Sequence, residues 1–151
     1  MTQSGSCRCG AVTYRIAQED LPQTYACHCL DCQSWSGSAF SLNALLPADS
    51  LTVEGPLARY AHETPSGSHS VQQVCATCHT RIFNTNEAVP GMIILRAGTL
   101  ANSQSLEPAA HIWTRRKQSW VNLPTDVPAF EETPTPTAFA SALALRSEQG
   151  R

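Results

Sequence analysis

The stretch from Val71 to Asn84, VQQVCATCHTRIFN, decides the fold of this chain. Its two ends are rich in β-branched and apolar residues, as strands are, and Cys75 and Cys78 lie between them in a Cys-x-x-Cys pattern. A turn of this kind at the tip of a hairpin lets two thiolates reach one metal ion, and its amide hydrogens can point at the sulfurs. The stretch therefore predicts a zinc-knuckle hairpin that offers two metal ligands.

A second close pair of cysteines, Cys7 and Cys9, lies near the start of the chain. After it, apolar and polar residues alternate up to Ile16, which is typical of a half-buried strand, and Gly10 can host a bulge between the pair and the strand. A zinc ion held by four thiolates is tetrahedral, so its ligands arrive best as two close pairs from different parts of the chain. The N-terminal pair and the knuckle pair would close one such site, and the metal would contribute directly to the free energy of folding.

The other three cysteines lie within six positions, in the run CHCLDC from Cys27 to Cys32 with Cys29 between them. Three thiolates can hold a second zinc ion and leave its fourth position for water or a substrate. Such an open position is what Lewis-acid chemistry requires. Spacing alone leaves the division of ligands open, since Cys27 and Cys29 could replace the N-terminal pair as partners of the knuckle.

Strand patterns dominate the rest of the chain. A turn of helix within Tyr25–Gly37 should lead into a strand over Ser38–Leu46 with alternating apolar residues. Prolines interrupt the chain after Leu123, but Thr135 can cap a last helix with Pro136 at its first position. Further strands are expected at Leu51–Val53, Leu57–Ala61, Met92–Arg96 and His111–Trp113. The sequence thus predicts a mainly β fold with few short helices and a C-terminal helix.

Length and composition exclude several classes of protein. The chain has 151 residues, which suits one domain, and 42% of them are hydrophobic, which suits a globular protein. Charged residues make up 15% of the chain, against an average of about 25%. Its net charge of -2 offers no basic surface for nucleic acid. No apolar run approaches the length of a membrane span and the first residues lack a signal-sequence pattern, so we expect a cytoplasmic protein. In a reducing cytosol the seven cysteines would bind metal rather than form disulfides.

Three ordered motifs carry a resemblance to a known family: GSCRCGAVTY from Gly5, CHCLDC from Cys27 and CATC from Cys75. The pattern resembles the glutathione-dependent formaldehyde-activating enzyme family, and centromere protein V has a domain of the same type. The similarity continues through Gly98-Thr-Leu100, His111-Ile-Trp113 and Trp120. We therefore expect a zinc-binding domain of this type over residues 1–131 and a Pro-rich extension over residues 132–151 that ends in a short helix.

The resemblance implies a mainly β, Mss4-like (β-tent) zinc-binding fold. It implies a structural zinc ion on the four cysteines that match the closed site of the family: Cys7, Cys9, Cys75 and Cys78. It implies a second, catalytic-type zinc ion on the three that match the open site: Cys27, Cys29 and Cys32. The named activity of the family joins formaldehyde to glutathione to give S-hydroxymethylglutathione, and is classed as that of a carbon–sulfur lyase.

Two positions depart from the pattern of the family. His79 stands where the family usually has glycine after the knuckle, and Ala101-Asn102 stands where acidic residues commonly follow Gly-Thr-Leu. Both positions concern substrate specificity, and the partners that the resemblance implies are a small thiol, glutathione or a similar one, and an aldehyde. A second copy of the chain is a further candidate partner, whereas nucleic acid and membranes are not expected.

Some residues near these motifs have both a structural and a chemical interpretation. His28 lies between two cysteines and, in an extended segment, points away from the metal, which favours packing or support of the ligands over catalysis. His111, Trp113 and Trp120 could line a pocket, although core or edge packing is the commoner role of such residues. For the basic cluster Arg115–Lys117 a solvated surface is the favoured interpretation, and docking of glutathione carboxylates is the weaker candidate.

Three functions fit these motifs. The first is a zinc-dependent carbon–sulfur lyase of the S-(hydroxymethyl)glutathione synthase kind, whose reaction centre is the open position on the zinc held by Cys27, Cys29 and Cys32. The second is a noncatalytic zinc-binding domain for protein interaction, although the chain has no long basic arm for chromatin. The third is redox or metal buffering by the same three cysteines. The incomplete ligand set favours the first.

Overall fold

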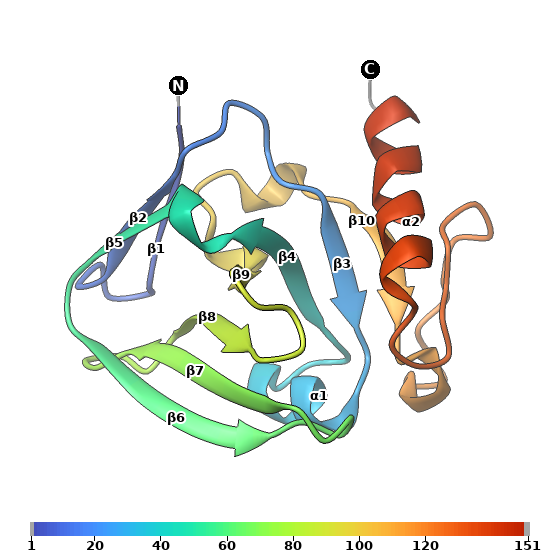
Figure 1. Cartoon of the computed structure of the whole chain (residues 1–151), viewed down its shortest axis with the longest axis horizontal. Coiled ribbons are helices and arrows are strands. Elements are labelled where there is room, and N and C mark those ends of the chain that lie inside the picture. Colours follow the sequence, from blue (N-terminus) through green and yellow to red (C-terminus); the bar gives the residue numbers. More distant parts are fainter. Residues whose placement is uncertain (1, 150–151) are drawn as a thin grey trace. The chain divides into compact units, whose positions relative to one another are not determined.

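The computed structural model describes residues 2–149 of the chain, which form two compact units. Unit 1 consists of Met1–Pro22 and Ala44–Ser105, and unit 2 consists of Gln23–Asn43 and Leu106–Arg151. Unit 1 is built mainly of strands, whereas unit 2 combines a few strands with both α-helices, and strands outnumber α-helices over the described residues (Figure 1). The mainly β prediction is therefore confirmed.

Unit 1 opens with a three-stranded antiparallel sheet in the order β1-β2-β5. Its strands are β1 (Gln3–Ser6), β2 (Thr13–Ile16) and β5 (Leu51–Glu54). Tyr14 and Ile16 are buried and alternate with exposed neighbours, which confirms the half-buried strand. Gly10 makes the turn before β2, with a φ of 81°, and its amide donates to the carbonyl of Cys7 at 3.2 Å. The expected bulge is therefore a tight turn, which glycine favours at positive φ.

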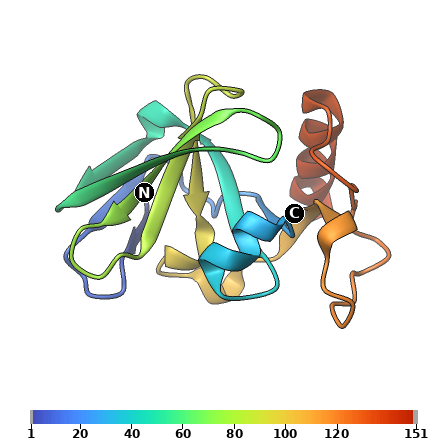
Figure 2. The same ribbon diagram turned by 90° about the horizontal axis from the view of Figure 1, so that it is seen from below.

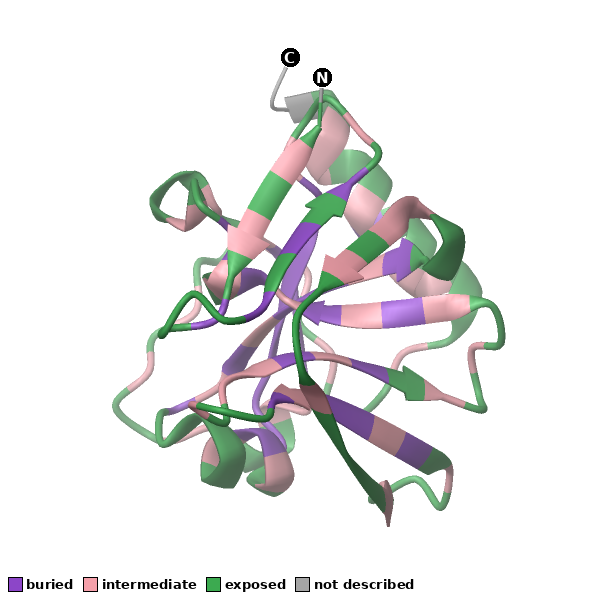
Figure 3. Cartoon of the chain, turned by 90° about the vertical axis from the view of Figure 1, so that its left-hand side faces the viewer, coloured by how far each residue is buried: buried purple, intermediate pink, exposed green. Residues whose placement is uncertain are grey.

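The other strands of unit 1 form an antiparallel meander that carries the knuckle. They are β6 (Leu57–Glu63), β7 (His69–Cys75), β8 (Arg81–Asn86) and β9 (Met92–Arg96), beside the second half of β4 (Ser41–Pro47). Buried and less buried residues alternate along β8 and β9, with Ile82, Ile93 and Leu95 in the core, whereas β6 has no buried residue; Figure 3 colours the chain by burial. A register shift between Gln73 and Val74 ends the regular ladder just before Cys75. The predicted hairpin is thus confirmed.

Unit 2 contains β3 (Thr24–Cys27) between β10 (Pro108–Ile112) and the first half of β4. The β10–β3 pair is parallel and the β3–β4 pair is antiparallel. All four residues of β3 are buried, which is typical of a central strand. The strand expected at His111–Trp113 starts earlier, at Pro108, and ends at Ile112, because Trp113 has left-handed backbone with a φ of 57°.

Two α-helices complete unit 2. Helix α1 (Leu30–Ser36) follows β3, and Gly37 ends it in the left-handed conformation that favours glycine. Helix α2 (Pro136–Gln149) packs against β10, as Figures 1 and 2 show. The hydroxyl of Thr135 accepts from the amide of Ala138 at 3.2 Å, and the ring of Phe139 meets Tyr25 edge-on with centroids 4.9 Å apart. The predicted C-terminal helix and its cap are confirmed, whereas a domain boundary after residue 131 stays a prediction.

Short 3-10 turns lie at the ends of several strands. They are η1 (Ala48–Ser50), η2 (Ala97–Thr99), η3 (Ser103–Ser105) and η4 (Thr114–Arg116). Within residues 2–149, none of the helices combines the length and the apolar character needed to cross a bilayer.

Candidate metal centres

Unit 1 brings together four cysteines from two distant segments. The sulfurs of Cys7, Cys9, Cys75 and Cys78 all lie within 4.8 Å of one another. The sulfur of Cys9 is 3.6 Å from that of Cys7 and 3.9 Å from that of Cys75. Cys7 follows β1, and Cys75 is the last residue of β7. The partition left open by spacing alone is therefore decided by the fold in favour of the N-terminal pair.

Hydrogen bonds from the surrounding backbone point at these sulfurs. The amide of Val12 donates to Sγ of Cys7 at 3.3 Å, and the amides of Thr77 and Cys78 donate to Sγ of Cys75 at 3.4 Å. The hydroxyl and amide of Thr80 lower the pKa of Cys78 to about 5. Such donors favour the thiolate over the thiol. The cluster therefore has the sulfur donor set, the ligand number and the supporting donors of a closed tetrahedral zinc site.

Unit 2 brings together the other three cysteines at the junction of β3 and α1. Cys27 ends β3, Cys29 caps α1, and Cys32 lies in the first turn of that helix. Their sulfurs also lie within 4.8 Å of one another, and all three residues are buried. The amide of Cys32 donates to Sγ of Cys29 at 3.4 Å. Within residues 2–149, no other histidine, cysteine or acidic side chain joins this group.

Protons are unevenly shared among these three thiols. Hydrogen bonds with Cys27 and Cys32 lower the pKa of Cys29 to about 3, whereas hydrogen bonds with Cys29 and Cys32 raise the pKa of Cys27. These hydrogen bonds favour the thiolate form at Cys29 and the thiol form at Cys27. A donor set of three sulfurs fits zinc with one position left for another ligand.

His28 lies between Cys27 and Cys29 in the sequence, and its ring contacts strand β10. Its Nε2 shares a hydrogen bond of 3.0 Å with Nδ1 of His111 on β10, and its ring packs on Phe40 with centroids 5.2 Å apart. His28 is fully buried, and its Nδ1 has no hydrogen-bond partner within the described residues. Burial, and then the nearby His111 and Lys117, lower the pKa of His28 to about 4. The ring therefore packs and supports the loop as a neutral imidazole.

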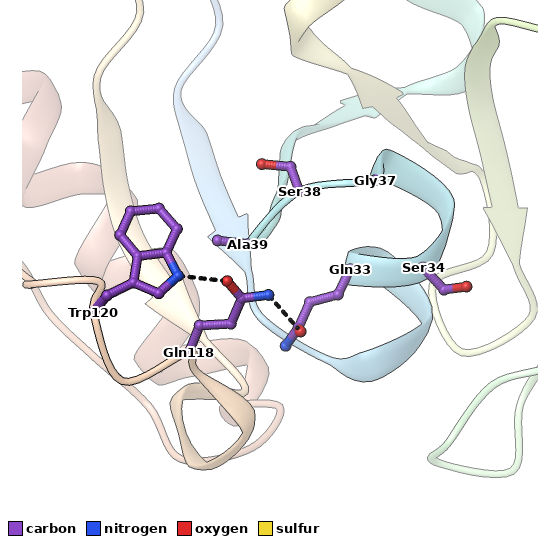
Figure 4. A pocket seen from close by; sticks show the side chains of 7 residues that line it. All are labelled: Gln33, Ser34, Gly37, Ser38, Ala39, Gln118 and Trp120. Carbon is purple, nitrogen blue, oxygen red and sulfur yellow. Dashed lines mark hydrogen bonds between the residues drawn. The ribbon is translucent and has the colours of Figure 1, made fainter.

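An open pocket with a volume of about 580 Å³ also lies in unit 2 (Figure 4). It is lined by Gln33, Ser34, Gly37, Ser38, Ala39, Gln118 and Trp120. The indole N–H of Trp120 donates to Oε1 of Gln118 at 2.7 Å, and Nε2 of Gln118 donates to Oε1 of Gln33 at 3.2 Å. Nε2 of Gln33 in turn donates to the carbonyl of His28 at 2.8 Å. A row of hydrogen bonds thus connects the pocket wall to the loop that carries Cys27 and Cys29.

Comparison with known proteins identifies the family of the chain. A model of the glutathione-dependent formaldehyde-activating enzyme family matches residues 2–116, more than half of the chain. The chain belongs to this family. Its mainly β fold with two cysteine clusters is the zinc-binding, Mss4-like fold of the family.

One solved structure supports the fold. It is a crystal structure of a Rhodobacter sphaeroides protein, a Northeast Structural Genomics target. It matches with a TM-score of 0.52 and 18% sequence identity, covering 83% of this chain and 98% of that chain. At this identity the likeness concerns the fold alone. No curated protein matches the chain.

One departure from the family pattern has a structural meaning. His79, where the resemblance to the family leads us to expect glycine, has left-handed backbone with a φ of 64°. Its amide donates to the carbonyl of Cys75 at 2.9 Å, which closes the knuckle turn. Glycine reaches this backbone conformation without a steric penalty, which gives a physical reason for expecting it here. His79 is exposed.

Two members of the basic cluster Arg115–Lys117 already have partners. Arg115 forms an ion pair with Glu132, and Nζ of Lys117 donates to the carbonyls of Gln118 at 3.3 Å and Val121 at 2.7 Å. Their engagement argues against the cluster as a ready-made clamp for carboxylates. The solvated surface favoured by the sequence and the weaker alternative of carboxylate docking both stay predictions.

The pocket partly matches the aromatic residues expected from the sequence. Trp120 lines it, but Trp113 donates its indole N–H to the hydroxyl of Thr133 at 3.0 Å, and His111 is buried against His28. Sequence reasoning missed Gln33 and Gln118, because an isolated glutamine has no spacing signal. Only the position of Gln33 directly after Cys32 could have drawn attention to it.

Proposed function

We propose that the chain is a zinc-dependent carbon–sulfur lyase that acts on adducts of a small thiol with an aldehyde, of the S-(hydroxymethyl)glutathione synthase type. One observation carries the proposal: Cys27, Cys29 and Cys32 form a buried group of three sulfurs without a fourth protein donor within the described residues. A closed structural site needs four ligands, whereas a catalytic site keeps one position for substrate. The family name supports glutathione and formaldehyde as the first pair to test.

We assign two zinc ions to the chain, one to each sulfur cluster. Cys7, Cys9, Cys75 and Cys78 would hold the structural ion, because their four sulfurs leave no position open. Cys27, Cys29 and Cys32 would hold the second ion, which supplies Lewis acidity and a positive charge that keeps a substrate thiol deprotonated.

The residues around the three cysteines would orient and desolvate the reacting groups. In the forward direction a carbon–sulfur bond forms, the carbonyl π bond breaks, and the proton of the thiol ends on the new hydroxyl, so the addition needs no oxidant. Burial of the three cysteines excludes bulk water from one side of the site. Gln33 holds the carbonyl of His28, and His28 holds His111, which fixes the backbone between Cys27 and Cys29.

Exchange NMR tests this function directly. Formaldehyde, glutathione and their adduct interconvert at equilibrium, so the exchange rate above that of a sample without protein reports turnover without a coupled enzyme. We expect the zinc-loaded chain to accelerate the exchange, and Cys32→Ala to abolish the acceleration by removing one ligand. Zinc per chain, measured by elemental mass spectrometry, is recorded on the same samples.

The control keeps the fold and removes only the proposed centre. Cys32→Ala should retain the circular dichroism spectrum of the wild type while its zinc content falls. Fully zinc-loaded wild-type protein that accelerates no exchange, with glutathione or with other small thiols and aldehydes, would contradict the lyase proposal. That result would favour the noncatalytic zinc-binding alternative.

A further inference from the structure

The pocket of unit 2 is lined by neutral polar groups and one large aromatic ring. We propose that it binds the uncharged, hydroxyl-rich body of the thiol substrate, with a sugar-like ring laid on Trp120. This inference rests on the proposed function, because it assigns the organic part of a thiol whose sulfur would go to the three cysteines of the open cluster.

The chemistry of the lining is the first argument. Two glutamine amides and two serine hydroxyls border the pocket, and none of its lining residues carries a charge. The two serine hydroxyls can both donate and accept hydrogen bonds, as the hydroxyls of a sugar do, whereas the Gln33 amide already donates to the carbonyls of His28 and Arg116 and holds the pocket wall in place. Carboxylates, in contrast, are held best by guanidinium or ammonium groups. The lining therefore matches a neutral polyol better than an anionic peptide.

The exposed ring of Trp120 is the second argument. Trp120 is 70% exposed, yet its indole N–H is bonded to Gln118, which fixes the ring beside the pocket. Figure 4 shows Gln118 between Trp120 and Gln33, with the loop of Ser38 and Ala39 across from the ring. An exposed aromatic face held in place in this way is a platform for the C–H face of a sugar ring.

The cations next to the pocket give the third argument. Arg115 is paired with Glu132, and the ammonium group of Lys117 is bound to two carbonyls. Arg116 is exposed and outside the lining, and its carbonyl accepts from Nε2 of Gln33 at 2.8 Å. Two of the three cations of this segment are therefore engaged, and none of the three lines the pocket, where carboxylates of a glutathione-like peptide would need them.

The position of the pocket links it to the metal centre. Gln33 directly follows Cys32 on α1 and hydrogen-bonds the carbonyl of His28 at 2.8 Å. One helical turn thus carries both a candidate metal ligand and a wall of the pocket. A ligand bound at the pocket would contact the same loop that positions the open cluster.

Calorimetric titration of the zinc-loaded chain tests the ligand class. The probes are a methyl thioglucoside and S-methylglutathione, whose methylated sulfurs cannot become metal-bound thiolates, so binding is measured apart from the reaction. We expect the thioglucoside to bind more tightly than S-methylglutathione by about tenfold or more, because it stacks on Trp120 without burying a charge. Trp120→Ala should weaken thioglucoside binding by about tenfold.

Two further variants sharpen the test. Trp35→Ala removes a tryptophan of α1 that does not line the pocket, and should leave both affinities unchanged. Ser38→Arg adds a cation to the lining and should tighten S-methylglutathione binding by about fivefold without improving thioglucoside binding. Zinc content and circular dichroism should be the same in all variants.

The outcomes separate this inference from the proposed function. Equal or tighter binding of S-methylglutathione, absence of thioglucoside binding, or an unchanged affinity in Trp120→Ala would each overturn the ligand class. Thioglucoside binding as expected, together with no catalysed thiol–aldehyde exchange, would support the pocket and overturn the lyase reaction.

Discussion

At the scale of single residues, His28 shows how burial sets chemistry. A histidine between two cysteines has a side chain that can bind a metal ion. The ring of His28 instead hydrogen-bonds to His111 and packs on Phe40. Full burial makes the charged imidazole costly, so the neutral form is preferred. Packing also restricts the residue type at position 5. Because Gly5 has no side chain, the ring of Tyr14 fits beside its backbone.

The pH dependence of stability follows from the low pKa of His28. Burial, with His111 and Lys117, lowers this pKa from 6.5 to about 4 in the folded chain. Between these two values the unfolded chain binds more protons, so the free energy of unfolding falls as the pH drops from 6.5 to 4. Above pH 6.5 the contribution is fully present, and its complete loss costs about 3 kcal/mol. Urea unfolding at several pH values measures it.

His28→Asn provides the reference for this measurement. The variant has no imidazole at this position, so the fall in stability between pH 6.5 and 4 should be smaller than in the wild type. Zinc content is measured at each pH in both proteins. A loss of stability that comes from metal release is common to the two and is thereby separated from the contribution of His28. Parallel curves for the two proteins would show that His28 is not the group responsible.

Gly5→Ala should destabilise unit 1 by about 1–3 kcal/mol, because it overpacks a filled space. A Cβ at Gly5 would lie 2.2 Å from the hydroxyl oxygen of Tyr14 and 2.5 Å from the carbonyl oxygen of Thr99. Gly98→Ala is the matched control, since a Cβ there meets nothing within 4 Å. Thermal unfolding of both variants tests the difference. Similar unfolding temperatures for the two would refute the close packing around Gly5.

At the scale of elements, local signals and packing agree most clearly in α2 and the knuckle. The helix has a hydroxyl cap before its first turn and a proline at its first position. Its Phe139 also packs edge-on against Tyr25 of β3, so a tertiary contact supports the local signals. The knuckle hairpin also agrees with its local sequence signal, because β7 and β8 pair along their length up to the turn that follows Cys75.

The cap of α2 gives a prediction at this scale. Thr135→Ala should destabilise the helix by about 1 kcal/mol, because the amide of Ala138 loses the hydroxyl that it donates to. Thr135→Ser should retain most of the stability, since it keeps the hydroxyl. Thr137→Ala, inside the helix, is the control and should cost little. Chemical unfolding measures all three, and equal losses at Thr135 and Thr137 would argue against the cap.

At the scale of the whole molecule, the two sulfur clusters have different consequences for folding. A zinc ion held by the four-sulfur cluster would tie the segment after β1 to the end of β7, which are far apart in the sequence. The three-sulfur cluster joins residues that are already close along the chain. A bond between distant segments removes more conformational freedom from the unfolded chain, so the first cluster matters more for stability.

Cys78→Ala should therefore leave poorly folded protein, whereas Cys32→Ala should fold and contain about one zinc ion fewer than the wild type. The sulfur of Cys78 belongs to the cluster that clamps unit 1, and that of Cys32 belongs to the open cluster of unit 2. Elemental analysis and circular dichroism of both variants measure the difference. Equal damage from the two substitutions would contradict this division of roles.

Much of the fold and of the metal centres could be predicted from the sequence, because their signals are local. Alternation marks β2, the Cys-x-x-Cys turn marks the knuckle, and Thr135 with Pro136 marks the start of α2. The pocket had no such signal, since Gln33 and Gln118 meet only in the folded chain, where they hydrogen-bond at 3.2 Å.

The sequence by itself determined which residues offer sulfur ligands and which segments become strands, because spacing and alternation act over a few residues. Only the tertiary structure decided that Cys7 and Cys9 join the knuckle, that His28 bonds to His111, and that Trp120 borders a neutral pocket. Those outcomes depend on contacts between distant segments, and the pairing of such segments is set by the packing of the whole unit.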